Sequence, residues 1–297
     1  MSKLPVIVAP MFLVSTPEMV IESGKAGVIG SFPLLNARPV EKCAEWLVEV
    51  KEALGTTPWA VNFICHKKAN KRYDEDLELI RKYEPPIVIT SLGHPGDVLK
   101  VVHGYGGLVY SDVANVVHAK KSAETGVDGL ILVCAGAGGH GGTLNPFAFI
   151  GAVKEFFDGT IILSGSISTG ADIAAAKLMG ADYAYVGTRF LAAEESSAQD
   201  EYKQMVIDST INDVLYTDAL SGVHANILIP SLIKEGIDPK TLKPRDDIDL
   251  THLVNVKAWR DIWSAGQGVT MVKKRETTKE IIETLRNEYE DGIAKLT

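Results

Sequence analysis

One segment of the chain has the residue types that proton transfer beside a bound ligand requires. Residues 138–142 read Gly-Gly-His-Gly-Gly and closely follow a buried strand predicted over residues 129–133. Glycines leave the backbone free of side chains, so a flat ligand can lie against it. Because imidazole titrates near neutral pH, His140 is a candidate general base or proton donor. A solvent-facing histidine in a flexible loop is the alternative.

Two later loops have the small residues that phosphate binding favours. Residues 164–170 read Ser-Gly-Ser-Ile-Ser-Thr-Gly, and residues 187–189 read Gly-Thr-Arg. Gly165, Ser166, Gly187 and Thr188 would let backbone N–H groups and hydroxyls approach a phosphate. Ordinary tight turns are the alternative. Since no P-loop lysine follows, we exclude a nucleoside triphosphate site.

The remaining titratable residues carry weaker patterns. No set of His, Asp or Glu has metal-ligand spacing, so we expect no catalytic metal. The basic cluster of Lys67, Lys68, Lys71 and Arg72 is interpreted as a solvated face, with an NADPH site as the alternative. Three widely spaced cysteines, none in a Cys-x-x-Cys pair, fit a reducing compartment.

Composition excludes several classes of protein. The chain has 297 residues, 46% of them hydrophobic, which is enough for a core and argues against disorder. Its net charge of −8 argues against nucleic acid or an anionic membrane as partner. Residues 4–14 are as apolar as a signal peptide, but Pro5 and Pro10 interrupt them. We therefore predict a buried first strand and a cytoplasmic chain.

Short apolar runs alternate with amphipathic helical segments along the first two thirds of the chain. We predict strands over residues 6–9, 27–31, 59–63, 87–91, 107–112, 129–133, 160–164 and 184–187. Continuous apolar runs are typical of strands buried on both faces of a parallel sheet. Eight strand–helix units predict an α/β fold, a (β/α)8 TIM barrel, with an open doubly wound sheet as the alternative.

The pattern breaks after residue 209, which suggests three parts. Residues 1–209 are predicted to form the barrel, and residues 210–265 a C-terminal excursion that caps the active-site mouth. Residues 266–297 would supply a Gly-x-Gly turn and a final helix from residue 278 that packs on the barrel. Trp263 in the excursion is equally well interpreted as a pocket residue or as a core anchor.

Several of these motifs together resemble one enzyme family. Pro10-Met11, Asn62, Ala-Gly-Gly-His over residues 137–140, Ser-Gly-Ser-Ile over 164–167 and Val-Gly-Thr-Arg-Phe over 186–190 are similar to those of nitronate monooxygenases, formerly called 2-nitropropane dioxygenases. The resemblance implies a barrel that binds FMN, with His140 as the catalytic histidine. The residues that it implies for FMN binding are Pro10, Met11, Asn62, Gly138, Gly139, Gly165, Ser166, Tyr185, Val186, Gly187, Thr188, Gln267 and Gly268.

Three positions depart from the family pattern. Val133 stands where many relatives have Gln, Gly136 where many have Glu, and Ser166 where many have Gly. The first two departures affect polar contacts to flavin and substrate. Ser166 can still donate through its backbone N–H.

The resemblance implies oxidation of an alkyl nitronate, or of the nitroalkane, with O₂ to a carbonyl compound and nitrite. An NAD(P)H-dependent flavin reductase, acting on an enoyl-acyl-carrier protein or a quinone, shares the same motifs and is the main alternative. A flavin-free barrel enzyme acting on a phosphorylated metabolite and a non-enzymatic flavin-binding module are the others. Oligomeric state is left open, with a homodimer as one arrangement.

Overall fold

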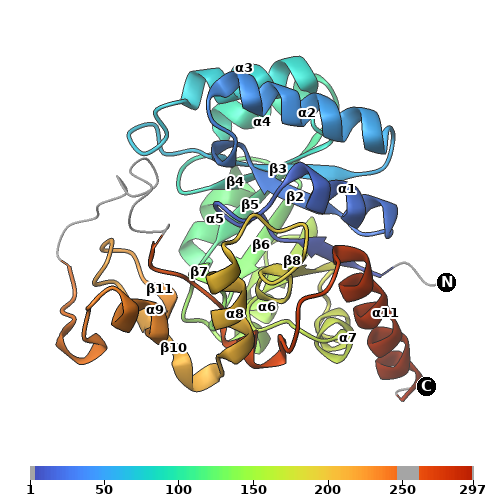
Figure 1. Ribbon diagram of the computed structural model, residues 1–297. Helices are drawn as coiled ribbons and strands as arrows, with labels where there is room; N and C mark the ends of the chain where they lie inside the picture. Colours follow the sequence, from blue (N-terminus) through green and yellow to red (C-terminus); the bar gives the residue numbers. More distant parts are fainter. Residues whose placement is uncertain (1–3, 246–260, 296–297) are drawn as a thin grey trace.

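The computed structural model describes residues 4–245 and 261–295, and the predicted barrel is its main feature (Figure 1). Eight parallel strands follow the order β1-β9-β8-β6-β5-β4-β3-β2. Their bounds are β1 Val6–Val8, β2 Gly30–Pro33, β3 Trp59–Ile64, β4 Ile87–Ser91, β5 Leu108–Val113, β6 Gly129–Val133, β8 Thr160–Ser164 and β9 Tyr183–Val186. The (β/α)8 prediction is confirmed.

The sheet closes between its first and second strands. Ile7 forms a parallel bridge with Ile29, and Val8 N donates to Ile29 O at 2.8 Å. The second strand begins three residues later than predicted because Gly27 ends helix α1 in a left-handed turn with φ of 85°. Closure of the sheet leaves little unpaired strand edge and gathers all the strand ends at one mouth.

Side chains alternate between two layers along each barrel strand. The interior holds a row of β-branched and aromatic residues that includes Ile7, Ile89, Tyr110, Ile131 and Ile162. The residues between them point outward and pack beneath the helices in the largest core cluster. Strand geometry repeats every two residues, so the residue two places beyond each interior side chain faces the mouth.

Helices cover the outside of the barrel. Their bounds are α1 Pro17–Lys25, α2 Val40–Leu54, α3 Tyr73–Tyr83, α4 Gly96–Gly104, α5 Val116–Glu124, α6 Pro146–Lys154, α7 Gly170–Leu178 and α8 Asp200–Asp208. Local caps explain several starts: Thr169 and Asp172 form a capping box at α7, and Thr16 accepts from Met19 N at 3.1 Å at α1.

The chain after α8 forms a second, smaller sheet. Strands β10 Val214–Thr217 and β11 Ala225–Leu228 pair antiparallel, and β11 pairs with a two-residue strand, β7 Gly139–His140. Helix α9 Ile229–Lys234 follows and lies beside α8 (Figure 1), where Lys234 Nζ contacts Glu201 Oε2 at 2.7 Å. Residues 246–260 of the predicted excursion lie outside the described residues.

The final helix returns to the barrel wall. Helix α11 Thr278–Ala294 packs against α7, and Glu288 accepts from Gly170 N at 2.7 Å. A Cβ on Gly170 would lie 2.2 Å from Tyr289 N, so the two helices approach at a position where only glycine fits. Among the described residues, no helix is long and apolar enough to span a bilayer, and no three potential metal ligands cluster.

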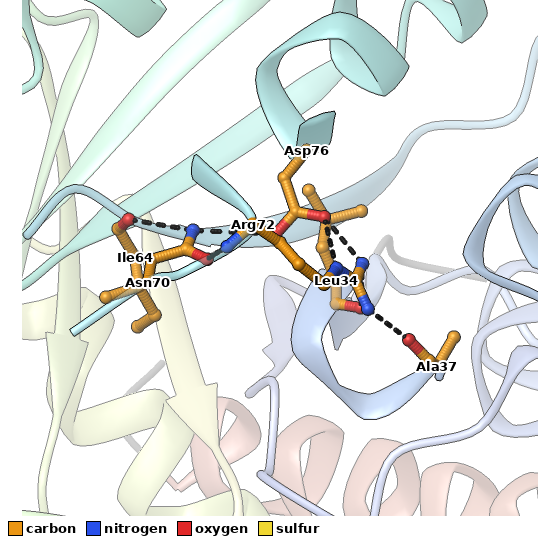
Figure 2. A network of polar contacts seen from close by, with 6 residues as sticks. All are labelled: Leu34, Ala37, Ile64, Asn70, Arg72 and Asp76. Atoms are coloured by element: carbon orange, nitrogen blue, oxygen red, sulfur yellow. Dashed lines mark hydrogen bonds and ion pairs between the residues drawn. The ribbon is translucent and has the colours of Figure 1, made fainter. Parts of the chain in front are cut away.

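The basic cluster of the sequence contains a buried structural ion pair (Figure 2). Arg72 Nη2 lies 2.5 Å from Asp76 Oδ1, and the Asp76 side chain is 1% exposed. The same guanidinium donates to the carbonyl oxygens of Ala37 and Leu34 at 2.5 and 3.3 Å. Arg72 therefore ties α3 to the loop after β2. Lys67, by contrast, makes an exposed pair with Asp97 at 3.2 Å.

We predict that Arg72→Met lowers the free energy of unfolding by about 3–5 kcal/mol, because it leaves the Asp76 carboxylate buried and uncompensated. Chemical denaturation followed by circular dichroism measures the change. Lys67→Met is the matched control and should change stability by less than about 1 kcal/mol, since exposed pairs contribute little. Equal effects of the two substitutions would contradict the structural role of Arg72.

Candidate active site

A pocket of about 660 Å³ opens at the carboxyl ends of the barrel strands. Its wall is formed by strand-end residues, by the glycine-rich loop after β6 and by the Gly-x-Gly turn near the C-terminus. This size is within the range of cofactor and substrate sites. The mouth of the barrel is also where βα-barrel enzymes place their chemistry.

The pocket brings together most of the residues predicted from the sequence. Those that line it are Pro10, Met11, Asn62, Gly138, Gly139, His140, Gly165, Ser166, Tyr185, Gly187, Thr188 and Gly268. Val186 does not line it, because its side chain is fully buried in the outer core beneath the helices. Gln267 does not line it either, because it is an exposed residue whose N–H donates to Gly136 O at 2.9 Å.

His140 is held by main-chain pairing rather than by a flexible loop. It occupies β7 opposite Ala225 of β11, and it is half-buried. Ser264 Oγ accepts from Gly139 N at 2.6 Å, and Asn226 Nδ2 donates to Ala137 O at 2.6 Å. The excursion therefore fixes the histidine at the pocket.

The two loops predicted to bind a phosphate both line the pocket. Gly165 and Ser166 follow β8, and Gly187 and Thr188 follow β9, the neighbouring strand. Within the described chain, no protein group accepts a hydrogen bond from the N–H of Ser166 or Thr188. Ser168 Oγ is buried, and none of the described residues forms a hydrogen bond with it. These donors suit an anionic group.

Ser166 adopts a backbone conformation that glycine prefers. Its φ is +55°, in the left-handed region that costs a residue with a Cβ about 1–2 kcal/mol. A Cβ on Gly136 would lie 2.0 Å from Ser166 Oγ. Two departures from the family pattern are thus complementary, since Gly136 leaves the space that the Ser166 hydroxyl occupies.

A chain of polar side chains forms the floor of the pocket. Asn62 Nδ2 donates to Ser91 Oγ at 2.7 Å, and Ser91 Oγ donates to Asp112 Oδ2 at 2.5 Å. Burial raises the pKa of Asp112 to about 6, and the Ser91 hydrogen bond opposes that rise. Burial also raises the pKa of Tyr185, whose hydroxyl has no hydrogen-bond partner in the part of the chain that the structure describes.

Sequence reasoning placed Ser91 and Asp112 at strand ends but assigned them no role. The signal was available in the two-residue period of the strands. Asp112 stands two residues after Tyr110, which faces the barrel interior, so its side chain faces the mouth.

The outer side of the pocket carries cationic and titratable side chains. His94, His118 and Lys121 line it. The His94 imidazole also accepts from Gly96 N at 3.1 Å, so it caps α4 as well. Trp263 does not line the pocket, since it is 2% exposed and stacks on Tyr202 at 5.0 Å. It is a core anchor.

Comparison with known protein families shows which enzymes this chain is similar to. The family model described as nitronate monooxygenase matches residues 31–288, which is most of the chain. The chain belongs to the nitronate monooxygenase family. Enzymes of this family are flavin-dependent oxidoreductases, and so is this protein.

Curated relatives agree with the family and differ in their activities. A nitronate monooxygenase of Paraburkholderia phytofirmans is 26% identical over 81% of this chain and 77% of its own. An indene-carboxyl-CoA dehydrogenase of Rhodococcus jostii is 25% identical over 77% of this chain and 64% of its own. A probable nitronate monooxygenase of Staphylococcus haemolyticus is matched over 54% of its own length, and a putative monooxygenase of Mycobacterium tuberculosis over 47%.

Solved structures show the same fold. A nitroalkane oxidase from Streptomyces ansochromogenes superposes with a TM-score of 0.84 at 23% identity, covering 99% of this chain and 98% of that one. FabK from Thermotoga maritima gives the same TM-score and identity, covering 99% and 95%. At this level of identity the likeness concerns the fold alone.

We predict that Ser166→Gly stabilises the flavin-free protein by about 0.5–1 kcal/mol while weakening FMN binding several-fold. Relief of about 1–2 kcal/mol of left-handed strain exceeds the added entropy cost of glycine, about 0.5–1 kcal/mol. Thermal unfolding and FMN titration by fluorescence quenching measure the two effects.

Glu84→Gly is the matched control. Glu84 has φ of 52° at the end of α3 and does not line the pocket. The substitution should stabilise the protein similarly and leave FMN affinity unchanged. If Ser166→Gly leaves the affinity unchanged too, the Ser166 hydroxyl does not contribute to cofactor binding.

Proposed function

We propose that this chain is an FMN-dependent nitronate monooxygenase, which oxidises alkyl nitronates with O₂ to carbonyl compounds and nitrite. The observation that most directly supports this proposal is the position of His140, which main-chain pairing holds at a pocket lined by Gly138 and Gly139. Family membership supports flavin chemistry at this pocket.

The pocket residues fit FMN. Ser166 and Thr188 offer free N–H groups, and Ser168 offers a buried hydroxyl, so these loops would hold the phosphate. Asn62 and Tyr185 on the floor would contact the ring. When bound, FMN would supply the electron transfer between donor and O₂.

The protein's own part is to bind, orient and exchange protons. The imidazole of His140 would take the proton from the carbon next to the nitro group when a neutral nitroalkane binds. With a nitronate, which has already lost that proton, the imidazole would donate a hydrogen bond to a nitro oxygen. The glycines beside His140 leave the substrate room to lie close to it.

An NAD(P)H-dependent reductase is the second candidate. The rim cation Lys121 and the imidazole of His118 favour it, because a phosphate-bearing substrate would find cationic partners there. The enoyl reductase domain of MlnA from Bacillus amyloliquefaciens has the same fold, with a TM-score of 0.74 at 15% identity. Lys67 and Arg72, considered above as an NADPH site, are instead engaged by Asp97 and Asp76.

We expect the purified protein to be yellow and to bleach on anaerobic mixing with propionate 3-nitronate. Readmission of O₂ should restore the absorbance and release nitrite. Absorbance spectroscopy and a nitrite assay record both steps. Bleaching by NADH or NADPH but not by the nitronate would establish the reductase instead. A colourless protein that does not take up FMN would contradict both.

We predict that His140→Asn retains FMN but slows turnover of neutral nitroalkanes by about 100-fold or more, the contribution of a general base. Turnover of preformed nitronates should fall far less, because no proton has to be removed. Steady-state oxygen consumption with the two substrate forms measures the difference.

His224→Asn is the matched control for that experiment. His224 stacks on Tyr216 with ring centroids 4.9 Å apart and does not line the pocket. It should leave both rates near those of the wild type. An equal loss on both substrates in His140→Asn would remove the base role from His140.

A further inference from the structure

The acidic side chain on the pocket floor has no part in the proton transfer assigned to His140. Asp112 lines the pocket, and its Oδ1 atom is buried without a hydrogen-bond partner in the described protein. A buried carboxylate oxygen that lacks a partner is costly unless a ligand or water supplies a donor. The Asp112 carboxyl group therefore lies at the pocket with only one of its two oxygens hydrogen-bonded among the described residues.

The other oxygen of the same carboxyl group is held in place. Ser91 donates to Oδ2, and Asn62 donates both to Ser91 Oγ and, at 3.2 Å, to Ile89 O. These side chains come from three neighbouring strands, β3, β4 and β5. Because the Asn62–Ser91–Asp112 chain rests on the barrel wall, it holds the Asp112 carboxyl group beside the pocket floor with little freedom to turn away.

The position of the Asp112 carboxyl group indicates which bound group would lie nearest to it. Asp112 rises from the barrel floor, whereas His140 is held by the cap through its pairing with β11. Asn62 lies on β3, and Ser166 follows β8, which is four positions away in the strand order. A flavin held by both residues would lie across the strand ends, with Asp112 on its floor side and His140 on its cap side.

We propose that Asp112 is a positioning and charge-tuning residue for the bound flavin, whose ionised carboxylate lowers the reduction potential of the ring. The proposal rests on the proposed function, since it requires FMN in this pocket. A negative charge beside the ring opposes the arrival of electrons. Beside a reduced flavin the Asp112 carboxylate would hold one proton, taken from water, in an O–H bond, and beside an oxidised flavin it would return that proton to water.

The sign of the effect follows from the ionisation of the group. Burial raises the pKa of Asp112 to about 6, so the carboxyl is neutral below that pH and charged above it. Above about pH 6 the charged carboxylate should therefore give the bound flavin a lower reduction potential than a neutral carboxyl would. A flavin of lower potential transfers electrons to O₂ more readily.

Other titratable groups around the pocket belong to different elements. Those that line it are His94, His118, Lys121, His140, Tyr185 and Tyr202, and the Cys65 thiol lies near enough for Asp112 to raise its pKa. In the described part of the chain, burial and Ser91 set the pKa of Asp112, with no contribution from a cation. The test must therefore separate Asp112 from the histidines.

The test is the midpoint potential of the FMN-loaded full chain between about pH 5 and pH 8, by reductive titration with dithionite against a reference dye. Wild type and Asp112→Asn should coincide at the acidic end. At the alkaline end the variant should be easier to reduce, and its equilibrium constant for flavin reduction should be about tenfold larger than that of the wild type. A tenfold change corresponds to one pKa unit of coupling between the carboxylate and the flavin. Asparagine keeps the shape and removes the charge.

A second variant keeps the proposal testable if Asp112→Asn does not take up FMN. Ser91→Ala removes the hydrogen bond that stabilises the charged form of Asp112. The slope of the midpoint potential against pH should therefore change at a higher pH than in the wild type. Ser111→Ala is the matched control, because Ser111 is buried and bonds to Thr90 and Ser122 instead. It should leave the curve unchanged.

Two outcomes would overturn the inference, and they can be told apart. Failure of the wild-type chain to take up FMN overturns the proposed function and this inference together. Bound FMN whose potential shows the same pH dependence in wild type, Asp112→Asn and Ser91→Ala overturns the role of Asp112 alone.

Discussion

The antiparallel pairing of β7 with β11 is the interaction on which the site depends. A glycine-rich loop has few side chains with which to hold its own conformation, so its backbone must be ordered by another segment. Here the segment after α8 supplies the partner strand, and Asn226 and Ser264 add hydrogen bonds to Ala137 and Gly139. The loop can therefore present bare backbone to a ligand and still hold His140 in one place.

In the barrel interior, the residues that stabilise the fold lie deeper than the polar residues that face the pocket. Its lower layers are isoleucines and other large apolar side chains that contribute burial. One step nearer the mouth, the same inward positions hold Asn62, Ser91 and Asp112. Unpartnered polar atoms and a left-handed Ser166 also gather at this level. Buried polar atoms without hydrogen bonds and a strained backbone conformation are both unfavourable. Among the described residues they occur together here, where a ligand is expected to supply the missing contacts.

The departures from the family pattern acquire a physical meaning in the structure. Gly136 and Ser166 are complementary, because a side chain at the first position would collide with the hydroxyl at the second. Val133 leaves the strand β6 side of the mouth apolar, while Asp112 on the neighbouring β5 supplies a charged group there.

The sequence alone determined the barrel and most of the pocket wall. Continuous apolar runs and turn residues are local signals, and they predicted strands β4, β6 and β8 to the residue. The motifs also placed His140 and the small-residue loops at strand ends. Tertiary structure alone decided that β7 pairs with β11 and that Oδ1 of Asp112 is buried without a partner among the described residues. These outcomes depend on contacts between residues far apart in the chain, and on which neighbours leave a polar atom without a partner. No local pattern encodes either.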